Sequence, residues 1–133
     1  MRADRATYLD SSAIVKLAVR EPESTALRRY LRSKRPLVTS ALARTEVARS
    51  MLALGPAAVA RGEEVLRRLE VVRVNDEILK TAGSMLPVEL RSLDAIHLAT
   101  ALSIGADLAR VCTYDDRMMA SAKALGLAVV APS

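Results

Sequence analysis

Aromatic side chains are almost absent from this sequence. Its 133 residues include no Trp, no Phe and only three Tyr. Proteins that bind single-stranded nucleic acid by stacking its bases need aromatic platforms, so the composition argues against that mode of binding. Hydrophobic residues still make up 51% of the chain, and we expect a core built of Leu, Val, Ile and Ala.

Cysteine and histidine are equally scarce, since Cys112 and His97 are the only ones. A single cysteine excludes an internal disulfide framework and fits a reducing compartment. Zinc sites are built from several Cys and His ligands, so the sequence also argues against zinc. We expect Cys112, inside an apolar run, to be a small core residue.

Long apolar runs are missing too. No stretch approaches the roughly 18 uninterrupted apolar residues of a membrane span, and the beginning of the sequence, MRADRATYLDSS, lacks the apolar run of a signal peptide. We therefore expect a soluble, cytoplasmic protein with no membrane association.

The length predicts one domain over residues 1–133. The net charge of +5 favours anionic partners, either nucleic acid or an acidic protein tail.

What the sequence does contain is an alternation of short β-prone runs and helical patterns. Such alternation predicts an α/β fold, with a central parallel sheet of about five short strands and helices on both faces. The expected strands cover residues 7–10, 36–40, 69–74, 109–115 and 127–132. The expected helices run from a cap at Ser11 or Ser12 to near Pro22 and then over residues 23–34, 40–54, 56–69, 75–86, 92–105 and 115–126.

Two acids follow expected strands directly. Asp10 ends the first strand, in the stretch TYLDSS, and Asp115 ends the run ARVCTYD. In a parallel sheet both lie at the carboxyl edge, where α/β folds place their ligand sites.

Two further acids are placed by helical angle. Glu46 lies within the apolar arc of residues 40–54, which we expect to include Val47, Met51 and Leu54. Asp94 lies on the apolar side of residues 92–105, in the first turn after an expected N-cap at Ser92. That end of the helix can face the carboxyl edge of the sheet.

Each acid also has a purely structural interpretation. Asp10 is a good helix cap, Asp115 or Asp116 is a good N-cap, Asp94 suits a helix N-terminus, and Glu46 can pair with Arg49. The placement of all four acids at the carboxyl edge of the sheet nevertheless favours a shared site. Clustered carboxylates repel unless a cation lies among them, and oxygen ligands suit Mg²⁺ or Mn²⁺. Such a site in a basic protein indicates phosphodiester chemistry.

A few other residues are ambiguous. We expect a structural or hydrogen-bonding role for His97 rather than a catalytic one. The basic stretch of residues 28–35 is either a solvated helix face or a surface that contacts phosphate or a protein partner. Lys16 and Arg91 lie close to the acids in sequence and have the same two interpretations.

The sequence resembles the PIN-domain family, and within it the VapC-type toxins of prokaryotic toxin–antitoxin pairs. The stretches that carry the resemblance are YLDSSAIVKL at 8–17, TSALARTEV at 39–47, LRSLDAIHLATAL at 90–102 and VCTYDDRM at 111–118. Together they span nearly the whole chain, and the first and third are the most specific.

The resemblance implies an endoribonuclease dependent on Mg²⁺ or Mn²⁺. Asp10 and Asp94 would be the main metal ligands, and Glu46 and Asp115 would complete the site. Ser11 and Thr113 match family positions that help to order it. The family pattern of Thr, any residue, then Asp selects Asp115 over Asp116.

The resemblance also implies a mechanism and partners. Water activated by the metal would attack phosphorus in line, without a covalent enzyme intermediate, and leave a 5′-phosphate on the product. The implied partners are an RNA substrate, a VapB-like antitoxin that lies across the active site, and a second copy of the chain in a homodimer.

The alternatives to a toxin ribonuclease are a PIN nuclease that acts in RNA maturation or on DNA and, from a different class, a silent binding module or phosphoacceptor domain. The phosphoacceptor pattern fits poorly, because Asp10 is followed by two serines and no second acid.

Overall fold

A computed structural model describes residues 5–133, so the expectation about a signal peptide lies partly outside the described residues. Five strands form one sheet, in which every neighbouring pair is parallel. The spatial order is β3-β2-β1-β4-β5. The strands are β1 (Ala6–Leu9), β2 (Leu37–Ser40), β3 (Glu70–Val72), β4 (Leu108–Cys112) and β5 (Val129–Val130). The predicted parallel sheet is confirmed.

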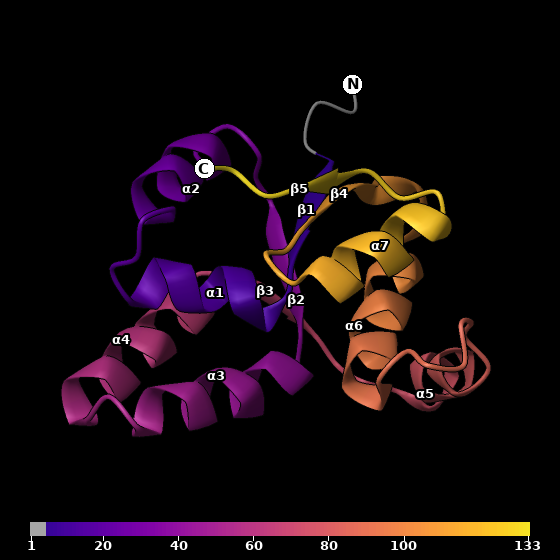
Figure 1. Cartoon of the computed structure of the whole chain (residues 1–133), viewed down its shortest axis with the longest axis horizontal. Coiled ribbons are helices and arrows are strands. Elements are labelled where there is room, and N and C mark those ends of the chain that lie inside the picture. The colour runs from indigo at the N-terminus through magenta and orange to yellow at the C-terminus, as the bar shows by residue number, and fades with distance from the viewer. Residues whose placement is uncertain (1–4) are drawn as a thin grey trace.

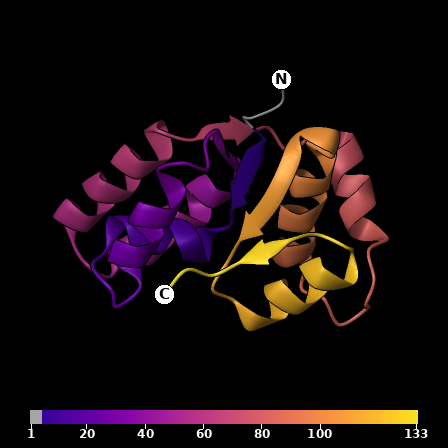
Figure 2. The same ribbon diagram turned by 90° about the horizontal axis from the view of Figure 1, so that it is seen from above.

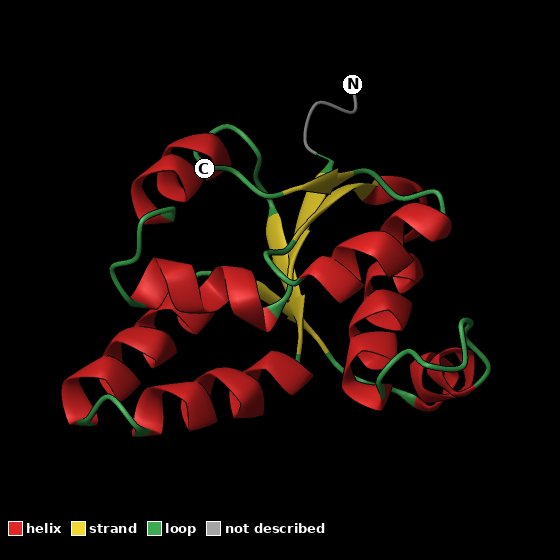
Figure 3. Cartoon of the chain, in the orientation of Figure 1, coloured by secondary structure: helices red, strands yellow, loops and turns green. Residues whose placement is uncertain are grey.

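Helices cover both faces of this sheet, as predicted (Figures 1 and 2). On one side lie α1 (Ser11–Ala18), α2 (Ser24–Leu31), α3 (Leu42–Leu52) and α4 (Pro56–Arg67). On the other lie α5 (Asp76–Gly83), α6 (Ser92–Ser103) and α7 (Asp116–Ala124). Colouring by secondary structure shows the strands enclosed between these two layers (Figure 3).

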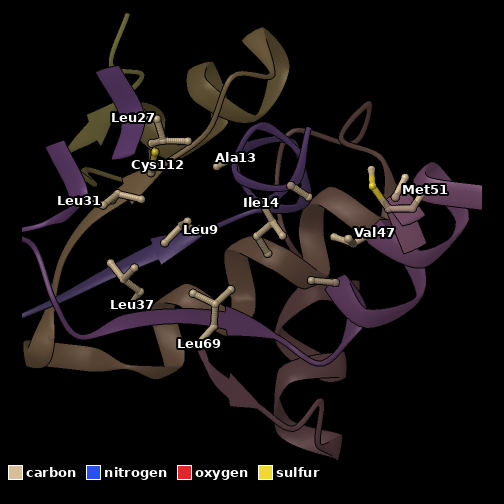
Figure 4. Close-up of a cluster of buried hydrophobic side chains, with 13 residues drawn as sticks. Leu9, Ala13, Ile14, Leu27, Leu31, Leu37, Val47, Met51, Leu69 and Cys112 are labelled. Carbon is tan, nitrogen blue, oxygen red and sulfur yellow. The ribbon is translucent and has the colours of Figure 1, made fainter. Parts of the chain in front are cut away.

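Burial explains why the strands are mainly apolar. All residues of β1 and β2 are buried, whereas the edge strands β3 and β5 are partly exposed. A strand covered by helices on both faces needs apolar residues throughout, without the alternation of a half-exposed strand. The largest core cluster fills the space between the sheet and α1 to α4, and its members include Leu9, Ile14, Leu27, Met51 and Cys112 (Figure 4). The core role expected for Cys112 is therefore confirmed.

Several predicted boundaries need correction. The cap of α1 is Asp10, not Ser11 or Ser12, because the Asp10 side chain accepts a hydrogen bond from the Ala13 N–H. Ser92 is the first residue of α6, and the N-cap position belongs to Arg91. Leu54 is 56% exposed, because α3 ends at Leu52 and the apolar arc ends with it.

The described part of the chain holds no helix that is both long and apolar enough to cross a membrane.

Candidate functional site

The topology brings the ends of β1 and β4 together. From β1 the chain moves outward through β2 to β3, and α5 and α6 then carry it back to β4 on the other side of β1. The strand order therefore reverses between β1 and β4, and α/β folds bind ligands beyond the carboxyl ends of the strands at such a reversal. Asp10 follows β1 here, and the loop of residues 113–115 follows β4. Helices α1 and α7 begin at this point (Figure 1).

Asp10 is a buried carboxylate, 4% exposed, with donors on both oxygens. Ser12 Oγ donates to Oδ1 at 2.6 Å, the Ala13 N–H donates to the same atom at 3.1 Å, and Thr113 Oγ1 donates to Oδ2 at 2.6 Å. Burial raises the pKa of Asp10 above its usual range, although the hydrogen bonds from Ser12 and Thr113 partly offset this. The side chain is thus held in one orientation at an electrostatic cost.

The two hydroxyls that hold Asp10 are themselves held by the loop after β4. The Tyr114 N–H donates to Ser12 Oγ at 2.9 Å, and the Asp115 N–H donates to Thr113 Oγ1 at 3.1 Å. Each hydroxyl therefore accepts a hydrogen bond from a backbone N–H and donates a hydrogen bond to the carboxylate of Asp10. The arrangement ties the start of α1 to the start of α7.

Asp94 and Asp115 share an electrostatic environment with Asp10. Partial burial raises the pKa of Asp94, and the negative charges of Asp115 and then Asp10 raise it further, while His97 and Arg91 act in the opposite direction. Asp94 lies in the first turn of α6. Asp115 caps α7, since its Oδ1 accepts from the backbone N–H groups of Arg117 and Met118. The structure thus brings these three acids near one another.

Glu46 joins this region through a chain of hydrogen bonds. Ser11 Oγ donates to Glu46 Oε1, and His97 Nε2 lies 2.6 Å from the same oxygen. On the other side of the ring, His97 Nδ1 lies 2.6 Å from the Tyr8 hydroxyl. Burial acts to raise the pKa of Glu46, but the hydrogen bonds from His97 and Ser11 outweigh it, so its pKa falls below the usual range. Glu46 therefore stays ionised at neutral pH.

The donor chemistry of these side chains fits a hard divalent cation. All four acids offer oxygen ligands, which Mg²⁺ and Mn²⁺ prefer, and a cation would relieve the repulsion that raises the pKa of Asp94. Within residues 5–133, however, no group of three or more Asp, Glu, His or Cys side chains is drawn together closely enough to form a complete ligand cage. The donor atoms and the charge of these residues suit a divalent cation. Among the described residues, their side chains do not form a closed set of ligands around one point.

Each of the two expected supporting residues contacts an acid of the candidate site: Thr113 donates to Asp10, and Ser11 donates to Glu46. A second serine, Ser12, also donates to Asp10. Ser12 and Tyr8 were not predicted from the sequence as parts of the site. A sequence signal was present for Ser12, because a hydroxyl two residues after a capping Asp can reach its carboxylate.

The structural alternatives are also resolved. Asp10 and Asp115 are both helix caps, so their structural interpretation is correct and leaves each carboxylate at the sheet edge. The partner of Glu46 is His97, not Arg49. His97 is 2% exposed and forms the expected hydrogen bonds. Lys16 pairs with Glu21 and Glu23.

Comparisons with known proteins agree with this architecture. A family described as "PIN domain" matches residues 7–127. The ribonuclease VapC46 of Mycobacterium tuberculosis is 62% identical over 128 residues, which cover 96% of this chain and 98% of that protein. The structure of VapC20 from Mycobacterium tuberculosis, a toxin that cleaves the sarcin-ricin loop, superposes with a TM-score of 0.74 at 21% identity and covers 95% of this chain and 99% of VapC20. A toxin–antitoxin complex from Klebsiella pneumoniae contains a chain that matches with a TM-score of 0.73 at 19% identity, over 96% of this chain and 98% of its own.

Proposed function

The chain belongs to the PIN-domain family, and on that basis we propose that it is a Mg²⁺- or Mn²⁺-dependent endoribonuclease that acts as the toxin of a toxin–antitoxin pair. The identity of 62% to a ribonuclease over 96% of the chain supports the activity. The observation that carries the proposal is the meeting of Asp10, Asp94 and Asp115 at the strand-order reversal, where partial burial and then the charges of the other two acids raise the pKa of Asp94.

The proposed roles follow from how each acid is held. Asp10 is fixed through both oxygens, so it would hold the cation in one place. Asp94 has no such fixing bonds among the described residues and would complete the coordination from α6. Glu46, kept ionised by His97 and Ser11, would orient the attacking water, and Asp115 would add negative charge from the start of α7.

A bound divalent cation would supply the chemistry that carboxylates lack, by lowering the pKa of a water molecule and by neutralising charge on the phosphate. The chain's own contribution is to concentrate acids at one edge and to prevent their rearrangement. The hydroxyls of Ser12 and Thr113 do this for Asp10, and the ring of His97 does it for Glu46. Fixed dipoles and charges of this kind need no reorganisation during the reaction.

An antitoxin partner and a homodimer remain part of the proposal. The Klebsiella pneumoniae structure of the same fold is a toxin–antitoxin complex, and the excess of positive charge on this chain suits a partner with an acidic segment. Growth arrest on expression of the chain, relieved by co-expression of the product of a small neighbouring gene, is the expected result. Arrest that no neighbouring gene relieves would contradict the toxin–antitoxin role and favour a PIN nuclease of RNA maturation.

Cleavage of RNA tests the activity directly. Purified full-length protein is incubated with end-labelled RNA in Mg²⁺, in Mn²⁺ or in EDTA, beside the variants Asp10→Asn and Asp94→Asn. We expect internal cleavage with either cation, no cleavage in EDTA and a loss of at least 100-fold in both variants. Asp76→Asn, which neutralises an acid in the first turn of α5, is the matched control and should cleave normally. Full activity of the two site variants would contradict the proposed site.

A further inference from the structure

A hollow of about 460 Å³ lies next to Asp94, between the start of α6 and the first half of α7. Asp94 forms part of its wall, together with Arg91 from the cap of α6 and Arg117 from the first turn of α7. Leu90 and Ser121 also line it. The hollow thus opens beside an acid of the proposed active site and carries cationic side chains from two different helices.

Both guanidinium groups are free to bind a ligand. Arg91 and Arg117 are exposed, and among residues 5–133 neither side chain forms an ion pair or hydrogen bond with another side chain. Glu89 also lines the hollow without pairing with either arginine. The two arginines are therefore not used to hold the fold together.

A second basic hollow allows a comparison. It is lined by Arg28, Arg32, Arg35 and Arg68, over an apolar floor. Leu37, the first residue of β2, and Leu69, just before β3, belong to that floor, so this hollow lies at the amino ends of the strands. Asp10 and Asp115 lie at the carboxyl ends. The second hollow therefore lies at the opposite end of the strands from these acids.

We propose that Arg91 and Arg117 bind a backbone phosphate of the RNA substrate adjacent to the scissile one, in the hollow beside Asp94. This inference rests on the proposed ribonuclease function and adds the residues that hold the substrate. Guanidinium groups bind phosphate oxygens through paired, charge-assisted hydrogen bonds. Phosphate contacts position a nucleic acid without reading its sequence. The two arginines would hold the strand in register with the acids.

Binding of RNA at several salt concentrations tests this inference. The protein carries Asp10→Asn to prevent cleavage, and the probe is a fluorescein-labelled single-stranded RNA of mixed sequence, followed by anisotropy. The logarithm of affinity falls with the logarithm of salt concentration by about 0.7 for each phosphate contact to a single strand. We expect Arg91→Gln and Arg117→Gln each to raise Kd about three- to tenfold. The double variant should make the slope shallower by about 0.7, the value for the one phosphate that both arginines hold.

Arg32→Gln is the matched control, because it removes the same charge from the other hollow. It should leave the slope unchanged. An unchanged slope in the Arg91→Gln, Arg117→Gln double variant would overturn the inference, as would a change seen only with Arg32→Gln. Weakened binding of polyglutamate with RNA binding intact would also overturn it, since the hollow would then be a protein-binding site.

Two further readouts separate this role from its rivals. If Arg91 acted only by offsetting the charge of Asp94, Arg91→Gln would change Mn²⁺ affinity measured by calorimetry. We expect that affinity to stay within about twofold, with KM for RNA raised more than kcat is lowered in the active protein. Failure of the unsubstituted protein to cleave RNA would refute the proposed function, whereas normal cleavage with an unchanged salt slope would refute only the role of the two arginines.

Discussion

Asp10 has two structural roles, and both rest on hydrogen bonds that its carboxylate accepts. As the N-cap of α1 it accepts the Ala13 N–H, and as a buried acid it accepts the hydroxyls of Ser12 and Thr113. A buried carboxylate is costly unless it is hydrogen-bonded, and these three donors limit the cost without removing it. Asparagine is also a good N-cap, and its amide could donate to Thr113. We therefore expect Asp10→Asn to keep the fold.

The pH dependence of stability reports the remaining cost. The pKa of Asp10 is raised above its ordinary value of 3.8, so the folded state binds the proton more tightly than the unfolded state. The contribution of Asp10 to the stability of the metal-free protein must then fall as pH rises from about 3.8 through its folded-state pKa. Asp10→Asn lacks this loss. Urea unfolding in EDTA should give the variant an advantage over the unsubstituted protein that is smallest near pH 4 and grows toward pH 7. A constant difference across that range would contradict the raised pKa.

Asp115 and Asp116 are adjacent, and the structure separates their roles. Asp115 caps α7 and lies near enough to Asp94 to raise its pKa, whereas Asp116 is the first helical residue. We expect Asp115→Asn to keep the cap and the stability while it lowers RNA cleavage at least tenfold. Asp116→Asn should cleave within about twofold of normal. Equal loss in both variants, measured with the same RNA, would mean that the charge of the loop matters and not the position of one carboxylate.

At the scale of the element, helix α4 approaches α3 through Gly62. A Cβ at this position would lie 3.0 Å from Met51 Cγ and 3.1 Å from Val47 Cγ1. Val47 is β-branched and has little rotamer freedom in a helix, so α3 cannot easily give way. Gly83, in the last turn of α5, has open space around it. The two glycines thus allow opposite outcomes for the same substitution.

Replacing each glycine by alanine tests this contrast. Alanine is favoured over glycine in a helix by about 1 kcal/mol, and we expect Gly83→Ala to gain up to about that amount. Gly62→Ala should lose about 1 kcal/mol, because overpacking outweighs the gain in helix propensity. Urea unfolding of both variants measures the difference. A stabilised Gly62→Ala protein would show that Met51 and Val47 can move apart without cost.

The elements were easier to predict from the sequence than their ends. Every predicted strand and helix is present, because the apolar runs and the helical patterns are distinct along the chain. Turn residues, such as Gly55 with Pro56 and Gly126, mark some of their boundaries. The ends depend on competition between neighbours. Asp10, Ser11 and Ser12 are all good caps. Asp10 takes the cap through the Ala13 N–H, whereas Ser11 and Ser12 bond to Glu46 and Tyr114, which lie far away in the sequence.

At the scale of the whole molecule, the parallel sheet could be predicted because its strands are short runs of mainly apolar residues, and the edge where Asp10 and Asp115 lie could be predicted with it. The hydrogen-bond network around Glu46 could not be predicted from the sequence. His97 has a helical angle at the margin of an apolar face, which indicates partial burial. Its nearly complete burial follows from the packing of α6 over Tyr8 and against α3, a long-range contact that no local pattern contains.

Calorimetric titration of Mn²⁺ into the metal-free protein tests whether the clustered acids bind a divalent cation. If acids from four separated segments hold one divalent cation, the unsubstituted protein should bind Mn²⁺ and unfold at a higher temperature in its presence. At a Mn²⁺ concentration of a hundred times Kd, the free energy of unfolding should rise by about 2.7 kcal/mol. Asp94→Asn should weaken that binding at least tenfold, with Asp76→Asn unchanged. Equal Mn²⁺ affinity in the unsubstituted protein and Asp94→Asn would contradict the account.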